Sequence, residues 1–250
     1  MPVSSSSTPD YGVDAPAVMR NLFLIGAACL LIAIFSPPFL HLGPVLLNVR
    51  TTFFWPAGIF LGEACLFLLY VKYGKFRHRD LMLSLHPWRG DEDVLDVGCG
   101  RGLLLAGAAK RLASLHGAGQ ATGLDVWSNV DMGGNSAAAT QHNLDLEGVS
   151  SRCILISKPA QEMPFPDAAF DVILSNLCLH NISDASVRRQ ALQQIVRVLK
   201  PGGIALISDY KLTSEYAKEF QRCGLTVEKK RGSFLTTFPP LTVVIARKPM

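Results

Sequence analysis

The sequence predicts an α/β domain with a mostly parallel sheet, preceded by two apolar segments that are long enough to reach across a membrane. Three observations lead to this prediction. From residue 94 onward, short apolar runs with branched side chains alternate with helix-like segments, which is the pattern of strand–helix repeats. One of these runs ends in three glycines spaced two apart, Gly98, Gly100 and Gly102. Before residue 72 the chain instead carries two long stretches that are almost free of charge.

The stretch over residues 94–102 (VLDVGCGRG) is a strand that runs into a glycine-rich turn and then into a helix over residues 103–112. Glycine has no side chain, so the turn offers bare backbone at the positive end of the following helix, where a ligand can lie. The spacing differs from the dinucleotide fingerprint G-x-G-x-x-G, because Leu103 stands where its third glycine would be. The alternative is a tight turn that binds nothing.

The pattern D-x-G-x-G-x-G, from Asp96 to Gly102, resembles the first motif of class I S-adenosylmethionine-dependent methyltransferases with a methyltransferase type 11-like domain. The resemblance implies a Rossmann-like, doubly wound, mostly parallel seven-stranded sheet with a terminal antiparallel hairpin. It also implies that S-adenosylmethionine is the cofactor and that the backbone of Gly98, Gly100 and Gly102 contacts its methionine part. Asp96 would help to hold the ammonium group of the cofactor, directly or through water.

A second strand, over residues 121–126, ends in an acidic residue one strand–helix unit beyond the glycines. A carboxylate at the tip of this strand can accept hydrogen bonds from both hydroxyls of a ribose bound over the first turn. The resemblance makes Asp125 this ribose-binding acid and places the adenine beside Val126 and Trp127. An aspartate that only caps the strand is the alternative.

The resemblance covers about residues 90–248 and extends to further positions. In the stretch PAQEMPFPD the acid that the family usually has beside the adenine is replaced by Pro159, which leaves Ala160 and Gln161 for that contact. Asn176 ends the fourth strand and completes the predicted cofactor-binding residues. Strands are expected over 153–157, 170–176, 225–229 and 241–246, and helices over 135–147, 186–199 and 214–223. Residues 199–207 are expected to form a helix end, a tight turn at the LKPGG phrase of residues 199–203 and then the fifth strand.

A candidate catalytic residue follows the fourth strand. The segment over residues 177–181 (LCLHN) lies just past the carboxyl end of that strand, the edge that faces the ligand in a parallel α/β sheet. There His180 could orient an acceptor or take a proton from it, since imidazole titrates near neutrality. The alternative is a histidine that packs on the cofactor without chemistry. Methyl transfer to a soft or anionic acceptor needs alignment and no base.

The composition excludes several other classes of function. The net charge of +4 is small and scattered along the chain, so we expect no nucleic acid partner. The six cysteines form neither a C-x-x-C pair nor a ligand cluster, so we expect free thiols in a reducing compartment, without disulfides or a metal site. The mean hydropathy of +0.26 is high for a soluble enzyme and directs attention to the apolar segments.

Two apolar runs precede the α/β domain. Residues 21–49 contain no Asp, Glu, Lys or Arg, and Glu63 is the only such residue over 51–71. At about 1.5 Å per residue the second run reaches about 30 Å, one hydrocarbon core. The first run is shorter, because Pro37 and Pro38 break any helix. The alternative to two spans is one span with a re-entrant or interfacial segment, and a cleaved signal peptide fits less well.

Basic residues follow the second run at once: Lys72, Lys75, Arg77 and Arg79. Such residues near the end of a span favour the cytoplasmic side, so we expect a multi-pass hairpin with the catalytic domain in the cytoplasm. A short amphipathic helix over 79–89 either closes over the cofactor or pads the sheet. The predicted organisation is a disordered tail over 1–17, a membrane hairpin over 18–71, a juxtamembrane segment over 72–89 and a methyltransferase domain over 90–250.

The sequence thus predicts a membrane-anchored methyltransferase that acts on a lipid-like or other small-molecule acceptor. Only residues 209–213 separate the fifth strand from the next helix, which leaves no room for an inserted lid over the acceptor. Access would then come from the segments over 72–89 and 177–185, toward the bilayer. The alternatives are an NAD-dependent oxidoreductase, which the glycine spacing disfavours, and a membrane scaffold that binds the cofactor without turnover.

Overall fold

The computed structural model describes residues 7–128, 134–233 and 236–250. These residues form two compact units: Val13–Gly74, and Lys75–Met250 together with the residues up to Gly12. Residues 1–6 of the predicted tail lie outside the described part of the chain.

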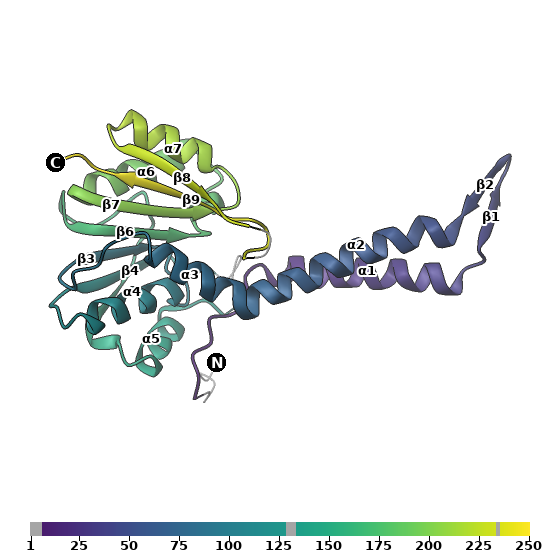
Figure 1. Cartoon of the computed structure of the whole chain (residues 1–250), viewed down its shortest axis with the longest axis horizontal. Helices are drawn as coiled ribbons and strands as arrows, with labels where there is room; N and C mark the ends of the chain where they lie inside the picture. Colours follow the sequence, from purple (N-terminus) through teal and green to yellow (C-terminus); the bar gives the residue numbers. More distant parts are fainter. Residues whose placement is uncertain (1–6, 129–133, 234–235) are drawn as a thin grey trace. The chain divides into compact units, whose positions relative to one another are not determined.

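The larger unit is built on a seven-stranded sheet with the strand order β5-β4-β3-β6-β7-β9-β8 (Figure 1). Neighbours from β5 to β7 are parallel, whereas β9 runs antiparallel between β7 and β8. The predicted mostly parallel sheet with a terminal antiparallel hairpin is confirmed. The strands are β3 (Asp93–Val97), β4 (Gln120–Asp125), β5 (Cys153–Ser157), β6 (Phe170–Asn176), β7 (Leu199–Asp209), β8 (Thr226–Arg231) and β9 (Thr242–Arg247).

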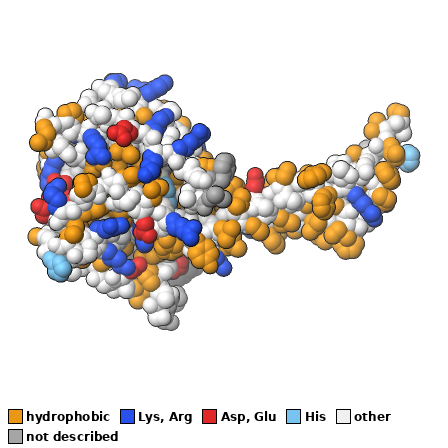
Figure 2. All heavy atoms as spheres, viewed as in Figure 1, with side chains coloured by type: hydrophobic (Ala, Val, Ile, Leu, Met, Phe, Trp, Pro, Cys, Tyr) orange, Lys and Arg blue, Asp and Glu red, His pale blue; other side chains and the backbone are white. Residues whose placement is uncertain are grey.

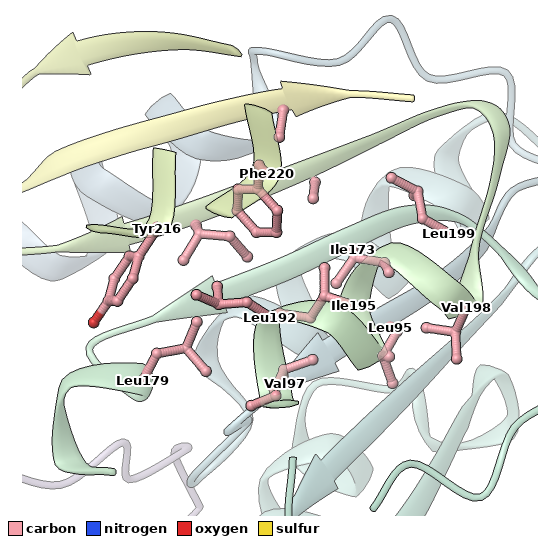
Figure 3. Close-up of a cluster of buried hydrophobic side chains, with 14 of the residues drawn as sticks. Leu95, Val97, Ile173, Leu179, Leu192, Ile195, Val198, Leu199, Tyr216 and Phe220 are labelled. Atoms are coloured by element: carbon pink, nitrogen blue, oxygen red, sulfur yellow. The ribbon is translucent and has the colours of Figure 1, made fainter. Parts of the chain in front are cut away.

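Helices cover both faces of this sheet, because successive side chains of each strand point to opposite faces. Val94 packs with the helices of one face, and its neighbour Leu95 packs with those of the other. Figure 3 shows the buried cluster on the face of Leu95, with Tyr216, Phe220 and Leu192 from the helices that cover this face. On the first face lie α3 (Lys75–Leu83), α4 (Leu103–Ser114) and α5 (Ala137–Leu146), and on the second α6 (Ala185–Val198) and α7 (Thr213–Arg222). Short helices are η2 (Ser150–Arg152) and η3 (Leu179–Asn181).

The LKPGG phrase is a bulge in a strand instead of the predicted tight turn before one. β7 pairs with β6 through Leu199 opposite Phe170, and the pairing resumes at Ile204 opposite Val172. The intervening residues loop out of the ladder. Gly203 fits there because an added Cβ would lie 2.9 Å from the carbonyl oxygen of Asp171.

Part of the predicted tail is folded onto the larger unit, which corrects the expectation of disorder over 1–17. Tyr11 is 7% exposed and its ring packs edge-on against Phe76 of α3. The tail prediction rested on small polar residues and missed this single aromatic anchor. The short helix expected over 79–89 is also corrected: α3 begins at Lys75 and ends at Leu83.

The smaller unit is a helical hairpin. Its elements are α1 (Pro16–Phe35), β1 (Phe39–Leu42), β2 (Val45–Asn48), α2 (Val49–Leu69) and the π-helical turn η1 (Tyr70–Gly74). The two strands pair antiparallel between the helices, a connection that the sequence did not predict. Asn48 caps α2 by accepting a hydrogen bond from the amide of Thr51 at 3.1 Å, so this helix begins two residues before the predicted run.

The two long helices of this unit meet through small residues. Gly26 and Ala33 are buried in α1, and Ala57 and Ala64 are buried in α2, each pair seven positions apart on one helix face. An added Cβ at Gly26 would lie 2.8 Å from the side chain of Leu61. Small residues that let backbones approach closely are typical of helix pairs in membranes.

Large apolar side chains cover the outside of the smaller unit (Figure 2). Phe35 is 78% exposed, Trp55 67% and Phe23 59%. Within the described residues, two helices are long and apolar enough to cross a membrane by length and composition, Pro16–Phe35 and Val49–Leu83. A surface of this kind is costly in water, so it indicates an apolar environment or a partner.

Candidate functional site

The glycine-rich turn after β3 depends on backbone conformations that other residues rarely adopt. Gly98, Gly100 and Gly102 have φ angles of 72°, 51° and 85°. An added Cβ at Gly98 would lie 2.1 Å from the sulfur of Cys178, which follows β6. The turn is therefore closely approached from the neighbouring strand, and the predicted glycine positions fit a backbone that a ligand can lie against.

Most amides of this turn already have partners inside the protein. The amide of Gly98 donates to the carbonyl of Leu124 at 2.7 Å, and that of Gly102 donates to Cys99 at 2.8 Å. Asp125 accepts from the amide of Gly100 at 2.7 Å and, through its other oxygen, from Trp127 at 2.5 Å. The turn therefore offers a ligand mainly a surface free of side chains, together with the remaining lone pairs of Asp125.

Two side chains of α5 hold the turn from outside, and sequence reasoning did not find them. The hydroxyl of Thr140 donates to the carbonyl of Gly100 at 2.6 Å. The amide nitrogen of Asn143 donates to the carbonyl of Arg101 at 2.9 Å. Their spacing of three places both on one face of α5, and this is the only sequence signal that they carried.

Asp96 lies at the heart of the turn and is 1% exposed. One of its carboxylate oxygens is buried without a hydrogen-bond partner among the described residues. Burial, and then the nearby charge of Asp125, raise the pKa of Asp96 to about 8. A cationic group placed against this oxygen would satisfy it and favour the ionised form, so Asp96 fits an ammonium group.

The other predicted cofactor residues line the same edge of the sheet. Asn176 ends β6 and has a buried side-chain oxygen without a partner among the described residues. Val126 follows β4 and is 61% exposed, and Ala160 and Gln161 lie half-buried in the turn after β5. Together with the glycine-rich turn, these positions lie at or just past the carboxyl ends of four adjacent strands, β5-β4-β3-β6. The structure thus brings all nine predicted residues to the carboxyl edge of the sheet.

His180 lies in η3, after β6, and is oriented by a carboxylate. Its Nδ1 lies 2.9 Å from one oxygen of Asp209, and its backbone amide donates to the other at 3.3 Å. Asp209 ends β7 and is fully buried, and it also accepts from the hydroxyl of Tyr216 at 3.1 Å and from the amide of Tyr210 at 2.8 Å. Burial and Asp209 raise the pKa of Tyr216, which keeps that hydroxyl a donor.

Asp209 is a site residue that the sequence interpretation missed. The signal was available, because Asp209 ends a strand of the parallel sheet just as Asp125 does, and carboxyl ends of parallel strands meet at one edge. The side chain of His180 keeps 12% exposure and packs edge-on against Tyr210 at 4.8 Å between ring centroids. A histidine held by a buried carboxylate through Nδ1 has its Nε2 left for a proton from a ligand.

The amino half of α3 reaches the same edge of the sheet. Nε2 of His78 lies 2.6 Å from the hydroxyl of Ser208, and Ser208 pairs with Asn176 in the sheet. Burial lowers the pKa of His78 to about 4, so its ring is neutral at pH 7. The carboxyl half of α3, with Met82 and Leu83, packs into the core. The helix therefore both pads the sheet and borders the site.

Residues 95–207 match the model of a family described as a methyltransferase domain. A sterol 4-C-methyltransferase of Caenorhabditis elegans is 33% identical over 125 residues, which are 50% of this chain and 33% of that protein. A 27-O-demethylrifamycin SV methyltransferase of Amycolatopsis mediterranei is 31% identical over 136 residues, 54% of this chain and 45% of that protein. The chain thus spans less than half the length of either relative.

The fold agrees with solved structures. A SAM-dependent methyltransferase from Aquifex aeolicus superposes with a TM-score of 0.55 at 18% identity, over 71% of this chain and 92% of that chain. At this identity the likeness shows the fold.

Proposed function

We propose that this chain is a membrane-anchored methyltransferase that moves a methyl group from S-adenosylmethionine to an acceptor that partitions into the bilayer. The observation that carries the catalytic part is the gathering of Asp96, Asp125 and the His180–Asp209 pair at one edge of the sheet. The exposed apolar surface of Val13–Gly74 supports the anchor.

The cofactor residues act by position and charge. When bound, S-adenosylmethionine supplies an electrophilic methyl group on a sulfonium centre. Asp96 would hold the ammonium group, the glycine backbone would border the methionine part, and the lone pairs of Asp125 left by its two amide bonds would accept from the ribose hydroxyls. Val126, Ala160, Gln161 and Asn176 would surround the base and sugar. Fixing the methyl group in one orientation is the main contribution to rate.

The His180–Asp209 pair would act on the acceptor. Nε2 of His180 would take the proton that an acceptor loses on methylation, and Asp209 would stabilise the resulting imidazolium through Nδ1. Within residues 210–212, between β7 and α7, there is no inserted lid, so the acceptor must be covered by other elements. α3 and η3 lie at the carboxyl edge of the sheet, where they would cover the acceptor.

The nature of the acceptor rests on the anchor. Nζ of Lys75 donates to the carbonyl of Gly12 at 2.5 Å, so both ends of the hairpin leave the larger unit from neighbouring points. That arrangement fits two spans with both ends in the cytoplasm. Lys75 is buried, so of the basic residues that follow the second span it is not one that faces the membrane surface. One relative is named for methylating a sterol, an apolar molecule, which supports a lipid-like acceptor here.

Asp125→Ala should weaken S-adenosylmethionine binding by about tenfold to a hundredfold, because a charge-assisted pair of hydrogen bonds to the ribose is lost. Isothermal titration calorimetry on the full chain in detergent checks this. Asp145→Ala, at an exposed carboxylate of α5, is the control. Unchanged affinity in Asp125→Ala would remove this residue from the cofactor site.

Asp96→Asn should uncouple cofactor binding from pH. In the folded protein the pKa of Asp96 is about 8, against about 3.9 for an unfolded chain. If the ammonium group binds the ionised form, binding releases a proton, and affinity rises up to about tenfold per pH unit from pH 6 to pH 8. The variant should bind more weakly at pH 8 and lose this rise.

The same variant should be more stable without cofactor. Because the folded pKa lies above the unfolded pKa, the buried acid opposes folding increasingly as pH rises from about 4 toward 8. Asparagine removes this penalty, so the gain in Tm of Asp96→Asn should be larger at pH 8 than at pH 5. Thermal unfolding at the two pH values measures it, and equal gains would contradict the assignment.

The anchor is tested by topology reporters at two positions. Gly43 lies in the turn between β1 and β2, and insertions are generally best accepted at exposed turns of this kind. A reporter at Gly43 should lie outside the cytoplasm, and one after Met250 should lie inside. Both reporters on the same side would exclude two complete spans and favour one span with a re-entrant segment.

A further inference from the structure

The segment Asp10–Gly12, here called the strap, is bound to the catalytic domain by an unusual number of polar contacts for three residues. The side chain of Asn143 pairs with the backbone of Asp10, accepting from its amide and donating to its carbonyl, both at 2.9 Å. The hydroxyl of Tyr11 donates to Glu147 at 2.5 Å. Both partners lie on the α5 side of the domain, beside the cofactor turn.

A buried cation fixes the other side of the strap. Lys75 is 6% exposed, and its Nζ donates to the carbonyls of Tyr11 at 3.1 Å and Gly12 at 2.5 Å. Burying an ammonium group is costly unless its hydrogen bonds are satisfied, and the strap carbonyls supply two of them. Gly12 has a φ of 64°, and its missing side chain leaves room for the side chain of Arg101, 3.2 Å from where a Cβ would be.

These contacts converge on the cofactor turn. Arg101 stands between Gly100 and Gly102, and its guanidinium donates to a carboxylate oxygen of Asp10 at 2.5 Å and to the carbonyl of Asp10 at 3.2 Å. The side-chain nitrogen of Asn143 donates both to the carbonyl of Arg101 and to the carbonyl of Asp10. The strap therefore holds the side chain of the central residue of the turn directly, and it also binds Asn143, the residue that holds the peptide carbonyl of Arg101.

We propose that the strap is a positioning element for the cofactor turn, so that tight binding of S-adenosylmethionine requires residues 10–12 although they lie far from the turn in sequence. The inference rests on the assignment of the turn as the cofactor site. With the strap released, the turn samples other conformations, and the apparent affinity falls in proportion to the population of the binding conformation. A truncated chain that lacks the amino-terminal residues together with the apolar segments would then lose cofactor affinity as well as the anchor.

The test uses two matched lysines of the full-length chain in detergent. Lys75→Met removes the two bonds to strap carbonyls. Lys248→Met removes two equivalent bonds, to the carbonyls of Val196 and Leu199 at 2.8 and 2.7 Å, away from the turn. Affinity for S-adenosylmethionine is measured by calorimetry. We expect Lys75→Met to weaken binding by about threefold to tenfold and Lys248→Met to leave it within about twofold.

Amide hydrogen exchange without cofactor separates positioning from general loss of stability. Lys75→Met should speed exchange at Gly100 and Gly102, whose amides in the turn are hydrogen-bonded, and leave the amides of Leu95 and Val97 in β3 protected. If Lys75→Met does not fold, Tyr11→Ala replaces it, since it removes the buried ring and keeps the backbone bonds.

The outcomes are distinct. Unchanged affinity in every folded strap variant, or an equal loss in the two lysine variants, would overturn the positioning role. Absence of S-adenosylmethionine binding by the unmodified chain would overturn the cofactor assignment itself and the strap with it.

Discussion

His180→Gln is expected to lower kcat by about 100- to 10,000-fold while leaving the affinity for S-adenosylmethionine unchanged. Glutamine keeps a polar side chain of similar reach, but it cannot accept the proton that the acceptor loses. Initial rates with membranes as the source of acceptor, followed by release of S-adenosylhomocysteine, measure the effect. His116→Gln, at an exposed histidine after α4, is the control.

Asp209→Asn should lower kcat in the same direction, because an amide cannot stabilise an imidazolium and can favour the wrong tautomer of His180. A histidine that only packs on the cofactor would leave kcat unchanged in His180→Gln. Full activity in both variants would mean that the acceptor is methylated by alignment alone.

Replacement of the hairpin by a linker is expected to abolish most turnover on a membrane-borne acceptor and to spare cofactor binding. Nζ of Lys75 reaches the carbonyl of Gly12, so about eight Gly/Ser residues can join residues 12 and 75 in place of Val13–Gly74. Because the strap is kept, affinity for S-adenosylmethionine should stay within about twofold. The value of kcat/KM on acceptor in vesicles should fall by about a hundredfold or more, through lost effective concentration.

An unrelated membrane anchor fused to the linker variant should restore most of this loss. A chain that begins at residue 75 is the contrasting variant, since it lacks both anchor and strap and should bind the cofactor more weakly. If the linker variant turned over equally well on acceptor in vesicles and in solution, the acceptor would be a soluble molecule. If the anchor failed to rescue, the hairpin itself would contribute to the acceptor site.

The sheet could be predicted from the sequence because its signals are local and mutually consistent. Buried parallel strands read as short branched runs, as in residues 153–157 and 170–176, whose predicted bounds match β5 and β6. The turn needs positive φ angles at positions 98, 100 and 102, and the three glycines in the sequence indicate this because glycine adopts such angles readily. Boundaries shifted by a residue or two where capping, as at Asn48, decides the first turn.

The parts that could not be predicted depend on contacts between distant residues. Tyr11 donates a hydrogen bond to Glu147, which is 136 positions away in the chain, and the residues around Tyr11 give no sign of this contact. Asp209 contacts His180, 29 positions away, and only the parallel order of β6 and β7 brings them together. The bulge over residues 200–203 also depends on a distant partner, because it is defined by the pairing of β7 with β6. Pro and Gly in the sequence indicate a break in regular structure, but they do not distinguish a bulge from a tight turn.

The most direct test of the central claim is transfer of a labelled methyl group. The purified full-length chain is incubated with methyl-labelled S-adenosylmethionine and vesicles made from a total lipid extract of membranes, and the lipid and aqueous fractions are separated. We predict label in the lipid fraction, in equal amount to the S-adenosylhomocysteine released, and its loss in His180→Gln. Binding of S-adenosylmethionine without any S-adenosylhomocysteine would contradict catalysis and leave a cofactor-binding scaffold, and label confined to water-soluble products would contradict the membrane-borne acceptor.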